Sequence, residues 1–95
     1  MARMASRPNQ VRVRYRGIPY TFDLVTCRRA LVKRQVEGEL DSMESLANAV
    51  GISRSTASRF FSGRPTSLAV TLKILGKLRL TFDDVAKPVV EADPV

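Results

Sequence analysis

The sequence predicts a mainly α-helical domain, a compact bundle of about five helices that contains a helix-turn-helix and follows one short N-terminal β-strand. Apolar side chains recur at helical spacing between residues 21 and 86, and glycines and capping residues divide that region into short segments. Residues 11–16, VRVRYR, instead alternate strictly, which is the period of a half-buried strand. The chain therefore divides into a flexible basic arm (1–10), a basic strand and turn (11–20), a helical domain that contains the helix-turn-helix (21–86) and a tail (87–95).

The charge distribution favours an anionic partner. Sixteen Lys and Arg residues outnumber nine Asp and Glu residues, which gives a formal net charge of +7. Residues 1–36 hold nine basic side chains and one acidic side chain, so the N-terminal third carries the excess.

The composition disfavours several classes of function. One cysteine and no histidine provide no internal disulfide, no metal-ligand cluster and no Cys-His dyad. A domain of this size has room for one small core but not for a deep substrate cleft. We therefore expect no enzyme activity, no cofactor, no metal and no small-molecule effector site. Because no apolar run approaches the roughly 20 residues of a membrane span and the first residues lack a signal-peptide centre, we expect a cytoplasmic protein without membrane contact.

The N-terminal strand has an apolar side and a basic side. The apolar members are Val11, Val13 and Tyr15, and the basic members are Arg12, Arg14 and Arg16. The apolar side could pack against the helices or against a second copy across a two-fold axis. The basic side could contact DNA phosphates, and a passive extension is the remaining interpretation. The preceding arm, with Arg3 and Arg7, either reaches a minor groove or has no role.

The first helix follows the turn Gly17-Ile18-Pro19 and is expected from its cap, Thr21, to Gly38. Asp23 falls in its first turn. Its inward positions are Leu24, Cys27, Leu31, Val32 and Gln35. Its outer face carries the cations Arg28, Arg29, Lys33 and Arg34. These cations are either solvated or in contact with phosphates.

The second and third helices are short. Asp41 or Ser42 caps the second helix, where Asp41 and Glu44 have the spacing of a capping box. Gly51 ends it, because glycine enters left-handed conformations readily. Ser53 caps the third helix and Gly63 ends it. The inward positions of the second helix are Leu46, Ala47 and Val50.

The fourth helix begins at Thr66 or Ser67 and is followed by a short helical turn from Thr81 to Ala86. Its inward positions are Leu68, Leu72, Leu75 and Leu78. Lys87 then opens the tail.

The third helix separates into two faces when residues 54–62 are placed at about 100° per residue. The core face holds Thr56, Ala57 and Phe60, and the polar face holds Arg54, Ser55, Ser58, Arg59 and Ser62. Short polar side chains let a helix approach the major groove, and arginine can donate two hydrogen bonds to guanine O6 and N7. A solvated surface face is the alternative interpretation. The glycine turn between two closely crossing helices favours DNA recognition.

Residues 46–63, LANAVGISRSTASRFFSG, followed by TLKILGKLRLTFDDV, resemble the lambda-repressor-like (Cro-type) helix-turn-helix family over about residues 24–86. The resemblance implies that residues 42–50 form a supporting helix and residues 53–62 a recognition helix. It assigns base contacts to Arg54, Ser55, Ser58 and Arg59, and phosphate contacts to Ser53, Ser62 and Arg64. The chain departs from the family pattern at Ala57, where a valine or isoleucine is usual, at Arg79, where a glycine is common, and in its basic strand.

The expected function is that of a sequence-specific, double-stranded DNA-binding transcription regulator, a small phage or phage-like repressor of the Cro or immunity-repressor type. With no effector domain after residue 86, it would act by operator occlusion. We also expect a homodimer on DNA, with the N-terminal strand as one candidate interface. Two alternatives remain: a DNA architectural or recombination accessory protein of the excisionase kind, and an antitoxin.

Overall fold

The computed structural model describes residues 9–89. The expectations for the arm residues Arg3 and Arg7 and for most of the tail therefore lie outside the described residues. In chain order, the elements are β1 (Gln10–Tyr15), β2 (Ile18–Asp23), α1 (Leu24–Val36), α2 (Met43–Val50), α3 (Arg54–Phe61), α4 (Leu68–Lys77), α5 (Phe82–Val85) and β3 (Ala86–Pro88).

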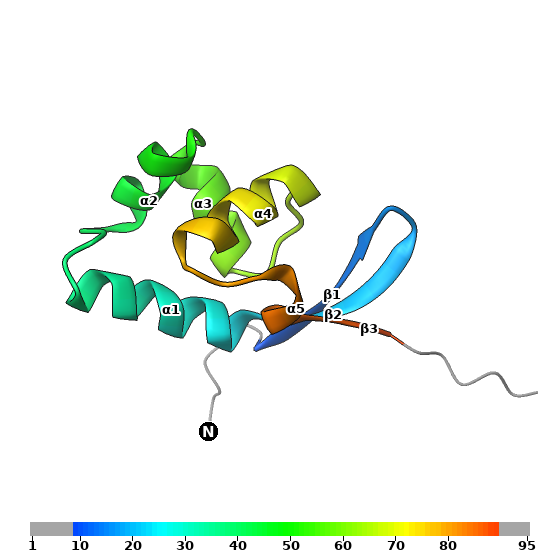
Figure 1. The fold of residues 1–95 in the computed structure, drawn as a ribbon. Helices are drawn as coiled ribbons and strands as arrows, with labels where there is room; N and C mark the ends of the chain where they lie inside the picture. Colours follow the sequence, from blue (N-terminus) through cyan, green and yellow to red (C-terminus); the bar gives the residue numbers. More distant parts are fainter. Residues whose placement is uncertain (1–8, 90–95) are drawn as a thin grey trace, which may run out of the picture.

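The expected fold class, a helical bundle with one added strand, is wrong. Five helices are present, but they share the described domain with a three-stranded antiparallel sheet in the order β1-β2-β3. The β1–β2 hairpin projects beside the helices, and β3 returns along β2 after α5 (Figure 1). The fold is therefore mixed, with strands from both ends of the helical region in one sheet.

The central strand β2 was missed because it begins with Ile18-Pro19, which resembles a turn. A proline lacks an N–H and is normally excluded from central strands. Here the carbonyl of Pro19 accepts a hydrogen bond from the N–H of Val89, at 3.0 Å, just past the end of β3. A residue's N–H and C=O point toward the same neighbour in a strand, so the missing N–H lies on the side of Val89, and the pairing of β2 with β3 lacks one hydrogen bond at this end.

A two-residue turn, Arg16-Gly17, closes the hairpin. Both residues have positive φ, 55° and 79°, as a type I′ turn requires. The basic strand therefore ends at Tyr15, and Arg16 belongs to the turn rather than to the basic side of β1. Lys87, expected in the tail, instead lies in β3.

Side-chain caps begin all five helices. Ser53 and Gly51 have the predicted roles, since the Ser53 side chain accepts from the Thr56 N–H and Gly51 is left-handed at the end of α2. Asp23 rather than Thr21 caps α1, because residues 18–23 are extended, and Ser42 caps α2 without the Asp41 capping box. Ser67 and Thr81 cap α4 and α5, and α5 carries a capping box of its own.

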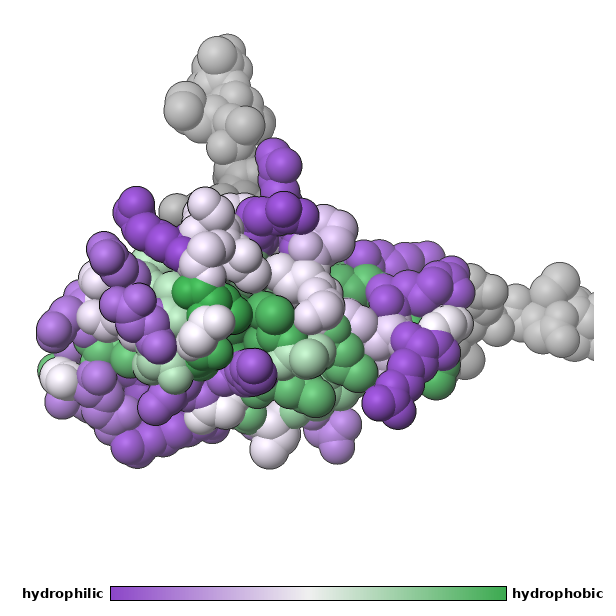
Figure 2. Space-filling view, turned by 90° about the horizontal axis from the view of Figure 1, so that it is seen from above, coloured by the Kyte–Doolittle hydropathy of each residue, from purple (hydrophilic) through white to green (hydrophobic). Residues whose placement is uncertain are grey.

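One core joins all five helices to the inner face of the sheet. Its buried apolar members include Phe22, Leu24, Leu31, Leu46, Phe60, Phe61, Ile74, Leu75, Leu78 and Val85. The predicted inward positions are wrong at Leu72, Val32 and Gln35, which are exposed. The buried side chains of α1 and α4 lie on neighbouring faces of the same helices. Seen from above, hydrophilic side chains surround an apolar area in the middle of the surface (Figure 2).

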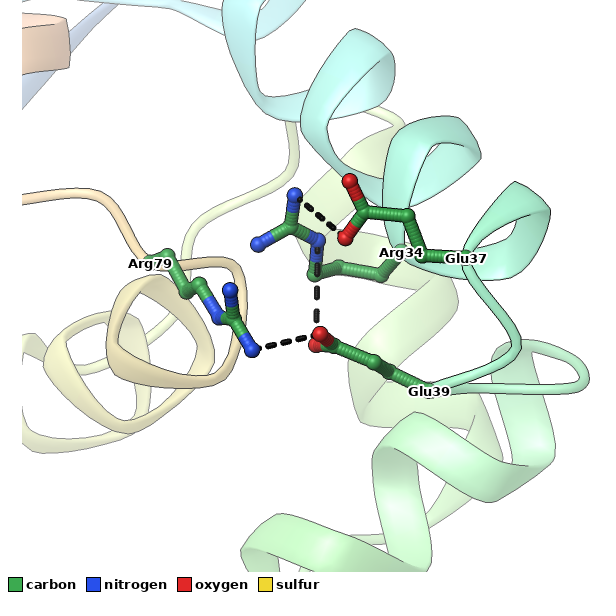
Figure 3. A network of polar contacts seen from close by, with 4 residues as sticks. All are labelled: Arg34, Glu37, Glu39 and Arg79. Carbon is green, nitrogen blue, oxygen red and sulfur yellow. Dashed lines mark hydrogen bonds and ion pairs between the residues drawn. The ribbon is translucent and has the colours of Figure 1, made fainter.

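Arg34 takes the fourth inward position of α1 and is only 5% exposed, so its expected place on the outer face is wrong. Its guanidinium lies 3.1 Å from a Glu37 oxygen and 3.8 Å from a Glu39 oxygen, and Arg79 contacts the other Glu39 oxygen (Figure 3). Charges are buried in proteins when they are paired. The network ties the end of α1 to the α1–α2 loop and to the end of α4, where Arg79 adopts a left-handed φ of 62°.

Among the residues that the structure describes, none of the helices is both long and apolar enough to cross a membrane.

Candidate nucleic-acid interface

The α2–α3 pair has the close crossing that a helix-turn-helix requires. Gly51, with φ 75° and ψ 34°, ends α2, and the N–H of Ile52 bonds back to the carbonyl of Ala47 at 2.9 Å. Ala47 and Ala57 are 1% and 0% exposed, so small side chains separate the two helices. The turn and the crossing together fix the direction in which α3 presents its outer face.

The outer face of α3 carries all four predicted base-contacting side chains. Arg54, Ser55, Ser58 and Arg59 are exposed, and the first three line one surface hollow. The opposite face is buried through Ala57, Phe60 and Phe61. Serines keep the outer face shallow, so the helix backbone can approach a base edge while the arginines extend beyond it.

Both predicted phosphate-contacting hydroxyls already have partners. Ser53 Oγ accepts from the Thr56 N–H at 3.0 Å and lies 2.9 Å from Thr56 Oγ1. Ser62 Oγ donates its proton to the carbonyl of Ser58 at 2.8 Å. Because a hydroxyl has a single proton, Ser62 can donate to a phosphate oxygen only if it breaks that bond. The hydroxyls therefore act first as caps of α3.

The loop after α3 lies alongside β1, which connects two regions of the predicted site. Arg12 and Arg14 border a surface hollow whose opposite wall comes from the loop at residues 63–66. Arg64 lies in this loop and is exposed. The arginines of the strand and of the loop thus belong to one continuous region at the C-terminal end of α3.

The outer face of the sheet adds a cation that sequence analysis missed. Arg12 pairs with Thr21, and Thr21 pairs with Lys87, so these three residues form one row across the sheet. Arg14 lies on the same face, and its Nη1 donates to the Gly17 carbonyl at 3.0 Å. The sequence signal for β3, which holds Lys87, was weak. A strand of three residues is too short to show an alternation of apolar and polar side chains.

The apolar side of β1 packs against the chain's own helices. Val11 and Val13 contact the core, and Tyr15 Oη lies 2.9 Å from Thr71 Oγ1. Of the two alternatives for this side, packing within one chain is therefore the one observed.

Arg28 fixes the C-terminal end of α3 to α1. Its Nε and Nη2 both donate to the carbonyl of Phe61, at 3.1 and 2.9 Å. A cation at a helix C-terminus satisfies a free carbonyl and interacts favourably with the helix dipole. Arg28 thus orients the recognition helix, a role that its place in a run of basic residues did not indicate.

The described residues contain no group of three or more metal-ligating side chains. Cys27 is fully buried, and burial raises the pKa of its thiol to about 12. A thiol with so high a pKa is protonated at neutral pH and is a poor nucleophile.

Comparisons of the chain with models of protein families, with curated proteins and with solved structures found no match. The resemblance of this chain to the lambda-repressor-like family therefore stays a prediction.

Proposed function

We propose that this protein is a sequence-specific, double-stranded DNA-binding regulator of transcription, a small repressor of the phage or phage-like kind. α3 enters the major groove, where Arg54 and Arg59 contact guanine edges and Ser55 and Ser58 let the helix approach. Two copies occupy two half-sites, and occlusion of the operator is the proposed mechanism.

The observation that carries this proposal is the outer face of α3. It combines two exposed arginines with two exposed serines on a helix whose other side is locked into the core. The restraint of both ends of α3 means that this face is presented in one orientation. Here Ser53 and the Gly51 turn fix the N-terminal end, and Arg28 fixes the C-terminal end.

Phosphate contacts are assigned to the adjoining cationic region. Arg64, Arg12 and Arg14 lie at the C-terminal end of α3, and Lys87 extends the row across the sheet. Such contacts position the protein on the duplex without reading its sequence. Arg16, in the turn, instead borders the hollow between the hairpin and α4.

Selection of bound duplexes from a random-sequence pool tests the proposal. A repressor of this kind should enrich one short motif, repeated in inverted orientation at a fixed spacing of roughly one or more helical turns. Recovery of unenriched sequences would overturn the assignment of sequence-specific recognition.

A salt titration tests the phosphate contacts. Arg12→Gln with Arg14→Gln should lower the slope of log affinity against log salt by roughly 1.8, at about 0.9 for each lost contact. Lys73→Gln with Lys77→Gln removes the same charge from exposed positions on α4 and is the matched control. Equal slopes for the two variants would show that Arg12 and Arg14 of β1 do not contact the phosphates.

The cationic sheet face also favours a second candidate, a recombination accessory protein that bends DNA. Cations beside a recognition helix can draw flanking phosphates toward the protein. In a circular-permutation assay, such a protein should bend its site strongly, and the selected motifs should be tandem and asymmetric rather than inverted.

A further inference from the structure

A hollow of about 330 Å³ lies between the second half of α1 and the segment that follows α4. None of the residues assigned to the DNA interface lines it. Its lining combines three cations with three apolar side chains: Lys33, Arg34 and Arg79, and Ala30, Leu78 and Leu80. An apolar wall with a few converging polar groups is the usual composition of a small-molecule site.

The guanidinium of Arg34 is buried but only partly partnered. Its Nη2 pairs with Glu37, whereas Nε, 3.8 Å from Glu39, has no hydrogen-bond partner among the described residues. The third nitrogen, Nη1, makes no ion pair with those residues and points toward the side on which Arg79 lies (Figure 3). Buried donors without acceptors are costly. An acceptor in the hollow would give Nη1 a partner.

Arg79 reaches the same hollow from a strained backbone. Its φ of 62° lies in the left-handed region, where glycine is favoured over residues with a side chain. A glycine would end α4 at this position without strain. The Arg79 side chain is 64% exposed, and an exposed ion pair such as its contact with Glu39 stabilises a fold very little. Strained residues of this kind concentrate at binding sites.

We propose that this hollow binds a small organic monocarboxylate. Guanidinium groups match the geometry of a carboxylate, so Arg34 and Arg79 hold it from two sides, and Lys33 adds an ammonium group. The three cations face two carboxylates, those of Glu37 and Glu39, which leaves one positive charge for a single negative charge to balance.

The apolar part of the lining sets the rest of the ligand. Leu78 is buried, and Ala30 and Leu80 are half-buried, so together they form a wall against which a short hydrocarbon body can pack. An inorganic anion would leave this wall in contact with water. A hydrated ion-pair network without any ligand is the competing interpretation.

An NMR titration of the full chain with hexanoate, at fixed ionic strength and without DNA, tests the inference, which goes beyond the proposed function and does not depend on it. The amide signals of Arg34, Arg79 and Leu80 should shift saturably. Three probes that each lack one part of the ligand should bind at least about tenfold more weakly: hexan-1-ol, which has no charge, acetate, which has almost no hydrocarbon body, and inorganic phosphate, which has none.

Arg79→Gly tests the role of the strained arginine. It removes the guanidinium but should stay folded, because glycine adopts a positive φ without strain, and hexanoate should then bind about tenfold or more weakly. Lys73→Gln, which removes an exposed cation of α4 outside the hollow, is the control and should bind hexanoate as the wild type does. Circular dichroism checks the fold of both variants. The absence of saturable shifts, equal binding of hexanoate and phosphate, or unchanged binding by Arg79→Gly would each overturn the proposal.

Discussion

Replacing Arg28 with methionine tests how the recognition helix is held. The change keeps the aliphatic stem but removes both hydrogen bonds to the Phe61 carbonyl. A hydrogen bond from a charged group contributes about 1.5 to 3 kcal/mol. The two donors share one acceptor and the site is only partly buried, so we expect a loss of about 2 kcal/mol in the free energy of unfolding. For a domain of this size, that loss lowers Tm by roughly 8 to 16 °C.

The neighbouring residue provides the control. Arg29 is exposed on the same helix, so Arg29→Met removes the same charge and should change the free energy of unfolding by no more than about 0.5 kcal/mol. Chemical denaturation of the two variants in parallel gives the comparison. Arg28→Lys should fall between them, since lysine restores the cation without the planar two-donor geometry. Equal loss of stability in Arg28→Met and Arg29→Met would show that the contact with Phe61 does not hold α3.

Three further predictions concern the core and its titratable groups. Ala57→Glu should unfold the domain, as measured by circular dichroism, because it buries a charge where α2 crosses α3; a folded variant would remove Ala57 from the crossing. Hydrogen bonds from Thr26, chiefly that of its side chain, lower the pKa of Asp23 below its ordinary value. The charged cap therefore stabilises the fold at every pH above the pKa that Asp23 has in the unfolded chain. This contribution is lost as the pH falls through the pKa of Asp23 in the folded protein. The stability difference between the wild type and Asp23→Asn should therefore disappear in strong acid, and a difference that persists there would rule out this cause. Cys27 should react with a thiol reagent at neutral pH only as fast as the domain unfolds, and prompt modification of the folded protein would contradict its burial.

The helices were predictable because their signals are local. Gly51 predicts the end of α2 and Ser53 predicts the cap of α3 from a few residues of sequence, and the structure confirms both. The two faces of α3 also follow from spacing alone, since Ala57 and Phe60 are buried while Ser55 and Ser58 are exposed. The polar face of α3, which forms the centre of the candidate site, could therefore be predicted from the sequence.

The sheet was not predictable in the same way, because its strands are defined by partners far apart in the chain. β3 consists of three residues whose only strand signal is their pairing with Tyr20, Thr21 and Phe22. Pro19 argues against a central strand, yet its carbonyl accepts a hydrogen bond from the Val89 N–H at the end of the pairing between β2 and β3. The turn at Arg16-Gly17 forms without an Asn-Gly or Asp-Gly pair, which are the common signals of a hairpin.

The roles of individual arginines were hidden for a related reason. Arg28, Arg29 and Arg34 look alike in a basic helix, yet Arg28 binds the end of α3, Arg29 is exposed and Arg34 is buried against Glu37. A carbonyl 33 positions away decides the role of Arg28. Sequence periodicity carries no information about such a distant acceptor.

The central claim is that α3 reads base edges, and the ratio of specific to non-specific binding tests it most directly. Affinities should be measured at one salt concentration for a duplex containing the selected motif and for a random duplex, with the wild type, Arg54→Ala, Arg59→Ala and the phosphate-contact control Arg64→Ala. A bidentate arginine–guanine contact contributes about 1 to 3 kcal/mol of discrimination, so each α3 variant should reduce the ratio by about 5- to 150-fold. Arg64→Ala should weaken both affinities and leave the ratio unchanged. An unchanged ratio in both Arg54→Ala and Arg59→Ala would contradict the assignment of α3 as the recognition helix.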